Sequence, residues 1–369
     1  REITKSPKAM DQFFAALHGV RNVPSDIVET YWDGEVSLWF SFEIVTIGGD
    51  IHFFVRTPTK HRNVLEANLY ANYPSLEIEE TKDYMGRFPH TLGGLYAKGL
   101  DLWGSELILE KPDPYPIRTY LQYEGADEEH SIDPIASILE VFRKIDRKEN
   151  IMFQMLLRPA DAGLQSPWKK RGDELVRTLK KKDLQISQSA FGEYEQFSVR
   201  TPGETEIMKA IEMNLSKSGY ETLIRYIYIA DKSVYNINFA KRGVVSACNQ
   251  YADTGLNRFN HNQKVYTQSR WINYPYFFPK RRAEVRKALV LRHYRQRKMP
   301  EESLVGKYLF VHGFNWNIHH RTYVINTEAI ATLYHPPTNL VLTAPLIRRI
   351  ESKRMGPAVS ADIFDETKE

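Results

Sequence analysis

The sequence predicts an α+β fold made of two ferredoxin-like units, each a split βαβ arrangement on an antiparallel sheet, joined by a basic helical arm. Three observations predict it. Short runs with strand-like alternation occur in both halves of the chain, and runs with helical spacing separate them. A lysine- and arginine-rich stretch lies between the halves. With 369 residues the chain is too long for one ordinary core.

The first 82 residues have the order strand, helix, hairpin, helix, strand, which predicts the first ferredoxin-like core. The expected elements are residues 1–4, 7–17, 36–44, 51–56, 60–73 and 76–79. Gly19 is a common helix terminator, and Pro74 ends the second helical run. Gly48 and Gly49 tolerate the positive φ that a tight hairpin turn requires.

An extension follows this core. Residues 107–109 and 118–123 resemble strands, and the prolines between them favour an edge or an exposed connection. Residues 133–147 have helical spacing, and the nearly continuous apolar run at 151–158 predicts a strand buried on both sides.

The second half repeats the order of helix then strand. The expected elements are helices at residues 205–219 and 238–251, a strand at 221–230, a basic helix within 256–299 and a short helix at 324–333. Asn326 or Thr327 is the expected cap of that last helix. No clean residue-level repeat joins the two halves.

These elements predict the domain organisation. The first α+β domain is expected at residues 1–160, with its ferredoxin-like core at 1–82. A basic linker or arm is expected at 161–190, and a second α+β domain at 191–351. The second domain contains the basic helical insertion at about 256–300, and residues 352–369 form a tail.

Composition narrows the function classes. The net charge of +4 argues against a uniformly basic coat for nucleic acid, although local patches remain open. The one cysteine, Cys248, has no partner for an internal disulfide. No run of about 18 apolar residues predicts a membrane span. The chain begins with Arg1 rather than Met, so we expect it to be a piece of a longer protein.

The motifs of several enzyme classes are absent from the sequence. It has no phosphate-binding loop with Gly-Lys-Ser or Gly-Lys-Thr, no dinucleotide fingerprint, no Gly-x-Ser-x-Gly elbow and no His-Glu-x-x-His helix. The sequence therefore predicts a chain that is not an enzyme and that uses no cofactor and no metal. An enzyme of unrecognised type stays open as a third alternative.

Three groups of residues resemble functional sites, but plain structural roles fit them better. His312, His319, His320 and His335 lie close in sequence, but their spacing matches no recurrent zinc pattern, so structural histidines are favoured. Cys248 has the setting of an inert core thiol rather than a nucleophile. The carboxylates of Glu77, Glu79 and Glu80 fit a solvated strand end better than an acid–base pair.

The densest basic stretch is the candidate binding surface. Its residues are Tyr274, Tyr276, Lys280, Arg281, Arg282, Arg286, Lys287, Arg292 and Arg295. Cations beside aromatic rings suit single-stranded nucleic acid, because the cations neutralise phosphates and the rings stack on bases. An anionic lipid surface would also attract such a helix. A solvated helix that contacts another protein, or nothing, is the third alternative.

Seven strings of residues carry a family resemblance. They are Phe-Phe-Ala-Ala-Leu-His-Gly at 13–19, His-Phe-Phe-Val-Arg-Thr-Pro at 52–58, Glu-Ala-Asn-Leu-Tyr-Ala-Asn-Tyr-Pro at 66–74, Glu-Ile-Glu-Glu at 77–80, Gln-Met-Leu-Leu-Arg-Pro at 154–159, Pro-Trp-Lys-Lys-Arg-Gly at 167–172, and Val-Ile-Asn-Thr-Glu-Ala-Ile-Ala-Thr-Leu-Tyr-His-Pro at 324–336. In order and spacing the chain resembles an uncharacterised domain family of candidate-phyla (Patescibacteria-type) bacteria. That domain is similar to the region preceding the motor in VirB4- and HerA-like type IV secretion or conjugation ATPases.

The resemblance implies a membrane-proximal accessory domain without catalytic residues. We therefore expect a non-catalytic interaction domain of a membrane-associated secretion or DNA-transfer system, cytoplasmic and at the inner face of the membrane. Its expected partner is an ATPase of the machine or further copies of itself. Whether a membrane anchor lies in a segment outside this chain stays open. The alternative is a nucleic-acid-binding module that uses residues 274–298.

Overall fold

The computed structural model describes residues 6–20, 38–123, 132–160, 166–181, 184–189, 192–197, 201–269, 278–300 and 319–337. Side chains are described in these ranges except at position 181 and in 184–197. The strand expected at residues 1–4 and the tail expected at 352–369 lie outside the described residues.

One seven-stranded sheet forms the centre of the protein. Its strands are β1 (Phe40–Ile47), β2 (Asp50–Arg56), β3 (Leu100–Leu109), β4 (Glu149–Pro159), β7 (Gly219–Asp231), β8 (Phe259–His261) and β9 (Tyr323–Asn326). Their order is β2-β1-β4-β7-β3-β8, and β9 pairs with the beginning of β7. Every pairing between these strands is antiparallel, so the α+β class is confirmed.

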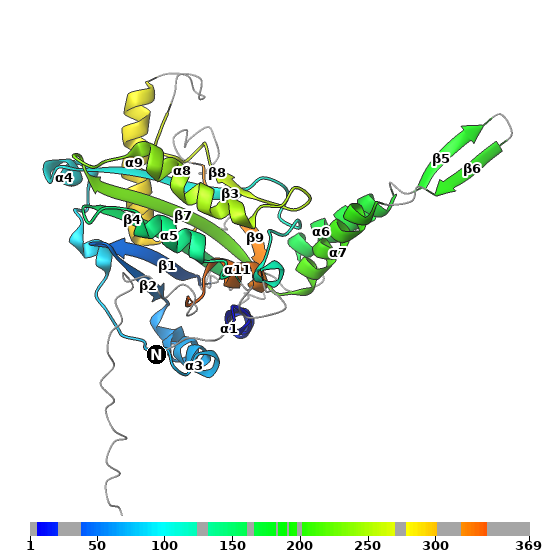
Figure 1. Cartoon of the computed structure of the whole chain (residues 1–369), viewed down its shortest axis with the longest axis horizontal. Coiled ribbons are helices and arrows are strands. Elements are labelled where there is room, and N and C mark those ends of the chain that lie inside the picture. The colour runs from blue at the N-terminus through cyan, green and yellow to red at the C-terminus, as the bar shows by residue number, and fades with distance from the viewer. Residues whose placement is uncertain are drawn as a thin grey trace, which may run out of the picture.

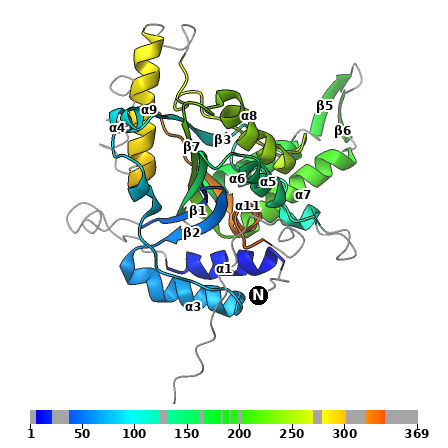
Figure 2. The same ribbon diagram turned by 60° about the vertical axis from the view of Figure 1, so that its left-hand side comes forward.

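Helices cover both faces of this sheet (Figure 1, Figure 2). They are α1 (Lys8–His18), α3 (Arg62–Asn72), α4 (Leu92–Ala97), α5 (Ala136–Arg143), α8 (Ile237–Cys248), α9 (Pro279–Gln296) and α11 (Thr327–Leu333). Helices α1, α3, α5, α8 and α11 pack on one face around an aromatic core. Helix α9 packs on the other face, beside α4 and the 3-10 turn η2 (Tyr84–Arg87).

The central strands are buried on both faces, which explains their long apolar runs. The sequence predicts this for residues 151–158, and in the structure nearly every residue of β4 is buried. β7 behaves in the same way over its 13 residues. Because helices cover both faces, neither strand shows the polar-out alternation of a half-exposed sheet.

The caps and turns that the sequence predicts at Gly19, Gly48, Gly49 and Asn326 are confirmed. Helix α1 is followed by Gly19, whose N–H bonds to the carbonyls of Ala16 and Leu17. Gly48 and Gly49 form the two-residue turn between β1 and β2, with φ of 63° and 98°. Only glycine adopts both angles without strain, and this turn fixes the register of the hairpin. Asn326 caps α11 by accepting from the N–H of Ala329.

A helical arm is inserted between β4 and β7. It consists of α6 (Pro167–Lys181), the hairpin strands β5 (Leu184–Ser189) and β6 (Gly192–Phe197), and α7 (Pro202–Ser216). The arm projects away from the sheet, with the hairpin at its far end (Figure 1, Figure 2). The sequence predicts a basic arm that crosses between domains. In the structure the chain leaves one central strand and returns to its neighbour, where the Ala160 N–H bonds to the Gly219 carbonyl at 3.0 Å.

The two expected ferredoxin-like sheets are not confirmed, because strands from both halves of the chain pair in one sheet. Residues 76–79 form no strand; Leu76 and Ile78 pack as extended chain against the aromatic core. Residues 120–122 form a 3-10 turn, η3 (Tyr120–Gln122), which Thr119 and Gln122 cap reciprocally. Alternation alone makes no strand where no neighbouring strand supplies backbone partners. The domain boundaries at 160 and 190 stay a prediction.

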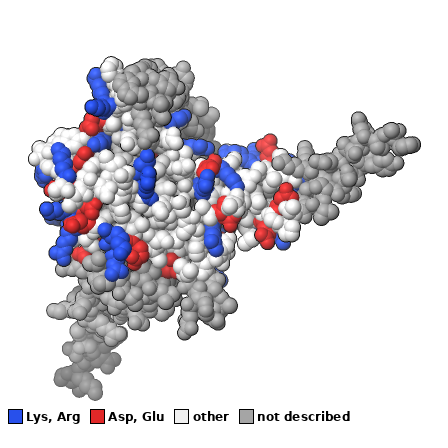
Figure 3. Space-filling model, turned by 45° about the horizontal axis from the view of Figure 1, so that its top comes forward, with Lys and Arg blue, Asp and Glu red and all other residues white. Residues whose placement is uncertain are grey.

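Charge is dispersed over the face seen in Figure 3, where Lys and Arg side chains lie among Asp and Glu. Among the described residues, no helix is both long and apolar enough to cross a bilayer.

A substitution of Gly104 on β3 tests how closely α9 packs on this strand. A Cβ there would lie 2.8 Å from Val290 Cγ1 and 3.2 Å from the Tyr226 carbonyl. We expect Gly104→Ala to lower the free energy of unfolding by about 1–3 kcal/mol, because the packed core must shift. Gly93→Ala in α4 is the control, since nothing lies within 4 Å of that Cβ and alanine favours a helix. Denaturant midpoints of the two variants measure the difference.

Candidate functional site

A row of four polar side chains crosses the sheet beneath α9. Glu43 on β1 lies opposite Gln154 on β4, which lies opposite Arg225 on β7, which lies opposite Glu106 on β3. Their exposed fractions are 1%, 0%, 1% and 2%. We call these four residues the polar row.

The polar row interrupts an apolar surface. The next residues on the same face are Met152 and Leu156 on β4, and Ile227 and Leu223 on β7, all fully buried. Burying unpaired charges here would be very costly, so every charge in the row requires a partner.

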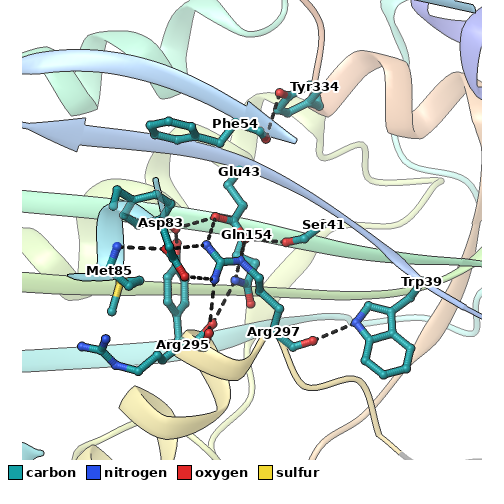
Figure 4. Close-up of polar contacts among 12 residues, drawn as sticks. Trp39, Ser41, Glu43, Phe54, Asp83, Met85, Gln154, Arg295, Arg297 and Tyr334 are labelled. Carbon is teal, nitrogen blue, oxygen red and sulfur yellow. Dashed lines mark hydrogen bonds and ion pairs between the residues drawn. The ribbon is translucent and has the colours of Figure 1, made fainter. Parts of the chain in front are cut away.

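Arg297 supplies the partner of Glu43. It follows α9 directly, in the left-handed region at φ 51°. Its guanidinium binds Glu43 through Nε at 2.8 Å and Nη2 at 3.2 Å. The same group binds Asp83 through Nη1 at 2.7 Å and Nη2 at 3.0 Å (Figure 4). The contacts to the two carboxylates offset the backbone strain of a non-glycine residue at positive φ.

Three further donors satisfy the Glu43 carboxylate. They are the Ser41 hydroxyl at 2.5 Å, the Tyr84 hydroxyl at 2.6 Å and the Gln154 amide at 2.9 Å. Although burial lowers the pKa of Arg297, its bonds to Asp83 and Glu43 outweigh burial and raise that pKa. The Arg297 side chain thus stays cationic and joins α9, β1 and the start of η2.

Arg225 is the buried cation in the middle of the row. Its Nη2 donates to the Lys298 carbonyl at 2.8 Å and lies 3.5 Å from Glu106 Oε1. Its Nε and Nη1 have no hydrogen-bond partner among the described residues. Burial lowers the pKa of Arg225, although nearby Glu106 opposes that effect.

A chain of two imidazoles ends the row. His320 Nδ1 lies 2.6 Å from Glu106 Oε1, and His320 Nε2 lies 3.0 Å from His293 Nδ1. Burial raises the pKa of Glu106, but His320 and Arg225 outweigh this and hold it below its usual value. Burial, with His320 and Arg225 nearby, lowers the pKa of His293 to about 3. His293 is therefore neutral at physiological pH.

A carboxylate that orients an imidazole is also a part of acid–base sites. Here the far nitrogen of His320 bonds to His293, and both imidazole side chains are only 8% exposed. Within the described ranges, no group of three or more His, Cys, Asp or Glu residues has the arrangement of a metal site. The geometry of the polar row therefore fits a structural role that fixes α9 on the sheet.

A family model described as Domain of unknown function (DUF8128) matches residues 3–303, well over half of the 369-residue chain. The chain belongs to this family. No curated protein matches the sequence. The DUF8128 match covers the arm and all four residues of the polar row, whereas His320 lies beyond it.

The basic residues predicted as a binding surface in this DUF8128 chain face two ways. Arg282 and Arg286 are buried, and Arg286 donates to the carbonyls of Gln263 and Tyr266. Lys287 pairs with Asp101 at 2.7 Å, and Arg295 donates to the carbonyls of Phe88 and Pro89.

Lys280, Arg281 and Arg292 are exposed. Tyr274 and Tyr276 lie outside the described residues. The predicted surface is therefore divided: four of its cations hold α9 on the protein, and three face outward.

The histidines predicted as neighbours do not form one cluster. His320 contacts Glu106 at the end of the polar row, whereas His335 packs in the aromatic core on the other face and contacts Asp133 at 2.8 Å. The His319 carbonyl accepts from Asn262, and His312 lies outside the described residues.

Cys248 has the inert core role that the sequence favours, and the three glutamates are solvent-exposed as predicted, although their segment is not a strand. Cys248 is 1% exposed, and burial raises the pKa of its thiol to about 12, so it is a poor nucleophile. Glu77, Glu79 and Glu80 are exposed, and Glu80 pairs with Arg62 at 2.6 Å.

The sequence does not predict the polar row. Each strand does carry a signal, because one charged or amide residue stands inside a run of apolar residues. The sequence does not show that the four positions align, since alignment depends on strand order and register.

Removing the buried ion pair between Arg297 and Glu43 tests how much it contributes to the stability of the fold. We expect Arg297→Met to lower the free energy of unfolding by roughly 3–5 kcal/mol, because Glu43 stays buried without a cation. The double variant Glu43→Gln with Arg297→Met should recover much of this loss. Arg62→Met is the control, because its ion pairs with Glu66 and Glu80 are exposed and screened by solvent, so their loss should change stability little. Equal losses for Arg297→Met and Arg62→Met would contradict this role.

The imidazole chain predicts a pH dependence of stability. The His293 pKa is about 3 in the folded protein, and an unfolded histidine titrates near 6.5. Between these values the unfolded chain binds the extra proton, so stability falls as the pH drops, by up to about 1.4 kcal/mol per unit. Between pH 7 and 5, a range above the usual pKa of a glutamate, His293→Asn should flatten this slope in denaturant titrations. The exposed-site variant His90→Asn should leave the slope unchanged.

Proposed function

We propose that this DUF8128 chain is a non-catalytic interaction domain of a membrane-associated type IV secretion-like or DNA-transfer machine. It acts at the cytoplasmic face of the membrane and docks an ATPase of the machine. The resemblance of its residue strings to regions before VirB4- and HerA-like motors supports the setting. The observation that carries the docking role is the arm between β4 and β7.

The root of the arm is firmly packed. Trp168 is 2% exposed and packs with Val176, Ile211 and Leu215 between the two helices. Gly172 allows close approach, since a Cβ there would lie 2.4 Å from Leu215 Cδ1. The Asn214 amide donates to the Pro114 carbonyl at 2.9 Å, which holds the root to the body of the protein. An arm fixed at its root can present its far end in a defined direction.

The outer surface of the arm is polar and charged with both signs. Helix α6 exposes four cations and two carboxylates, and α7 exposes three carboxylates and one cation. They are Lys170, Arg171, Arg177, Lys180, Asp173 and Glu174 on α6, and Glu204, Glu206, Glu212 and Lys209 on α7. Only part of this charge is neutralised inside the arm, as in the pair of Lys180 with Glu212 at 3.2 Å. Charged rims steer association and select partners, and Met213, 57% exposed, adds apolar area on α7.

The nucleic-acid alternative receives less support from the geometry. Four of the seven cations proposed for it are engaged within the protein, and on the face of Figure 3 acidic side chains lie among the basic ones. Tight single-strand binding usually requires a continuous basic groove with accessible rings.

Removing the tip of the arm tests the docking role. Residues 182–200 would be replaced by a short Gly-Ser loop, which leaves Thr201 and Glu204 to cap α7. We expect the variant to keep the unfolding midpoint of the parent, because the packed root is retained. Its capture of a VirB4-type ATPase from the same genome should weaken at least tenfold. Full capture by the tip-less variant would contradict the role of the arm. A parent chain that stays a strict monomer and captures no ATPase would overturn the proposal.

Reversing the exposed cations of α9 distinguishes ATPase docking from nucleic-acid binding. We expect the triple variant Lys280→Glu, Arg281→Glu and Arg292→Glu to capture the ATPase as the parent does. If the parent bound single-stranded DNA with a steep salt dependence, and the triple variant lost that binding, the nucleic-acid function would replace the docking one.

A further inference from the structure

β2 is the edge strand of the sheet, and its outer side has a defined hydrogen-bonding pattern. The two-residue turn makes Ile47 and Asp50 a hydrogen-bonded pair, so the even-numbered residues of β2 bond to β1. The N–H and C=O groups of Ile51, Phe53 and Val55 therefore point outward. No described residue forms a backbone hydrogen bond to these outward groups.

The sequence of β2 is complementary to itself in the antiparallel direction. Pairing two copies about Phe53 places Ile51 opposite Val55 and His52 opposite Phe54 of the other copy. It also places Asp50 opposite Arg56 at both ends. Neither Asp50 nor Arg56 forms an ion pair with another described residue. Arg56 is exposed and acts on Asp83 only through a weak electrostatic effect that helps to lower the Asp83 pKa. This centred register uses the whole strand and makes both end pairs attractive.

We propose that β2 pairs with β2 of a second copy of this chain, antiparallel and centred on Phe53, so that the two sheets become continuous. The outward-facing residues then form the hydrogen-bonded pairs, Phe53 with Phe53 and Ile51 with Val55. The two-fold axis is perpendicular to the sheet, so each face of one copy continues the same face of the other.

Half-buried side chains of β2 gain cover in this arrangement. Phe53 and Val55 lie only partly buried at the margin of the aromatic core, and Phe53 packs against Tyr334 with ring centroids 5.7 Å apart. On the other face His52 stacks on Phe54, which stacks on Tyr84. Each of these side chains would meet an apolar or aromatic neighbour of the other copy.

The contact is small. A pair of seven-residue strands buries less than the roughly 1,200 Å² typical of stable complexes, so we expect a dissociation constant on the order of 100 μM or weaker. It becomes effective where a larger assembly holds copies side by side, because local concentration then replaces intrinsic affinity. The pairing is independent of the arm, so the tip-less variant should associate through β2 like its parent.

Disulfide trapping tests both the contact and its register. Cys248 is buried and is the one native cysteine, so an introduced thiol reacts alone. Under mild oxidation Phe53→Cys should form a covalent dimer, because the two positions are directly opposite. Val55→Cys should not, since its two copies lie about 13 Å apart along the strands, beyond the ~7 Å reach of a disulfide. Mixing Ile51→Cys with Val55→Cys should restore a covalent pair.

Charge exchange supplies a test that leaves the core intact. Asp50→Arg places like charges at both ends of the contact and should weaken association about tenfold in sedimentation experiments. The double exchange Asp50→Arg with Arg56→Asp should restore the parent value. Val55→Pro should also abolish association, because it removes an outward N–H and leaves the ladder to β1 unchanged.

Three results would overturn the inference. The first is no covalent dimer of Phe53→Cys at millimolar concentration, and the second is equal trapping of Phe53→Cys and Val55→Cys. The third is a monomer whose Ile51, Phe53 and Val55 amides are protected from hydrogen exchange, which would mean that another segment of the same chain covers the edge. If the parent chain captured no ATPase while Phe53→Cys still formed the covalent dimer, the docking proposal alone would fail and the β2 pairing would stand.

Discussion

The fold depends on the ion pair between Glu43 and Arg297. It joins positions 254 residues apart in sequence, and both side chains are almost inaccessible to solvent. Through Asp83 the same guanidinium holds the segment that carries Tyr84, whose hydroxyl returns to Glu43. One cation thus connects β1, η2 and the end of α9. Without it, the helix that covers this face would lie over an unpaired carboxylate.

A buried ionic row is a costly way to hold a helix, since well-packed apolar residues often give equal or greater stability. We interpret its value here as specificity of register. If β1 shifted by one residue against β4, Glu43 would enter the aromatic core on the opposite face; a shift by two would separate it from Gln154. The polar row therefore penalises alternative pairings of long apolar strands that otherwise have little to distinguish them.

Local structure was largely predictable from the sequence, whereas long-range pairing was not. Helix α1 with Gly19, the turn at Gly48 and the buried β4 follow from patterns within a few residues, and the structure confirms them. Pairing of β4 with β7 across the arm depends on contacts that no local pattern encodes. The sequence predicts Arg286 as a surface cation for the same reason. Composition shows that α9 is basic, but only its packing on the sheet decides which of its side chains face inward.

The arm also has a consequence for how the chain folds. Strands β4 and β7 are neighbours in the sheet, yet the segment 160–218 separates them. Bringing the ends of such a segment together costs conformational entropy that grows with its effective length. If α6 and α7 pair first as a local hairpin, the flexible length shrinks and the central ladder forms sooner. Variation in the outer part of the arm would then leave sheet assembly unaffected, so this part is free to change with its partner.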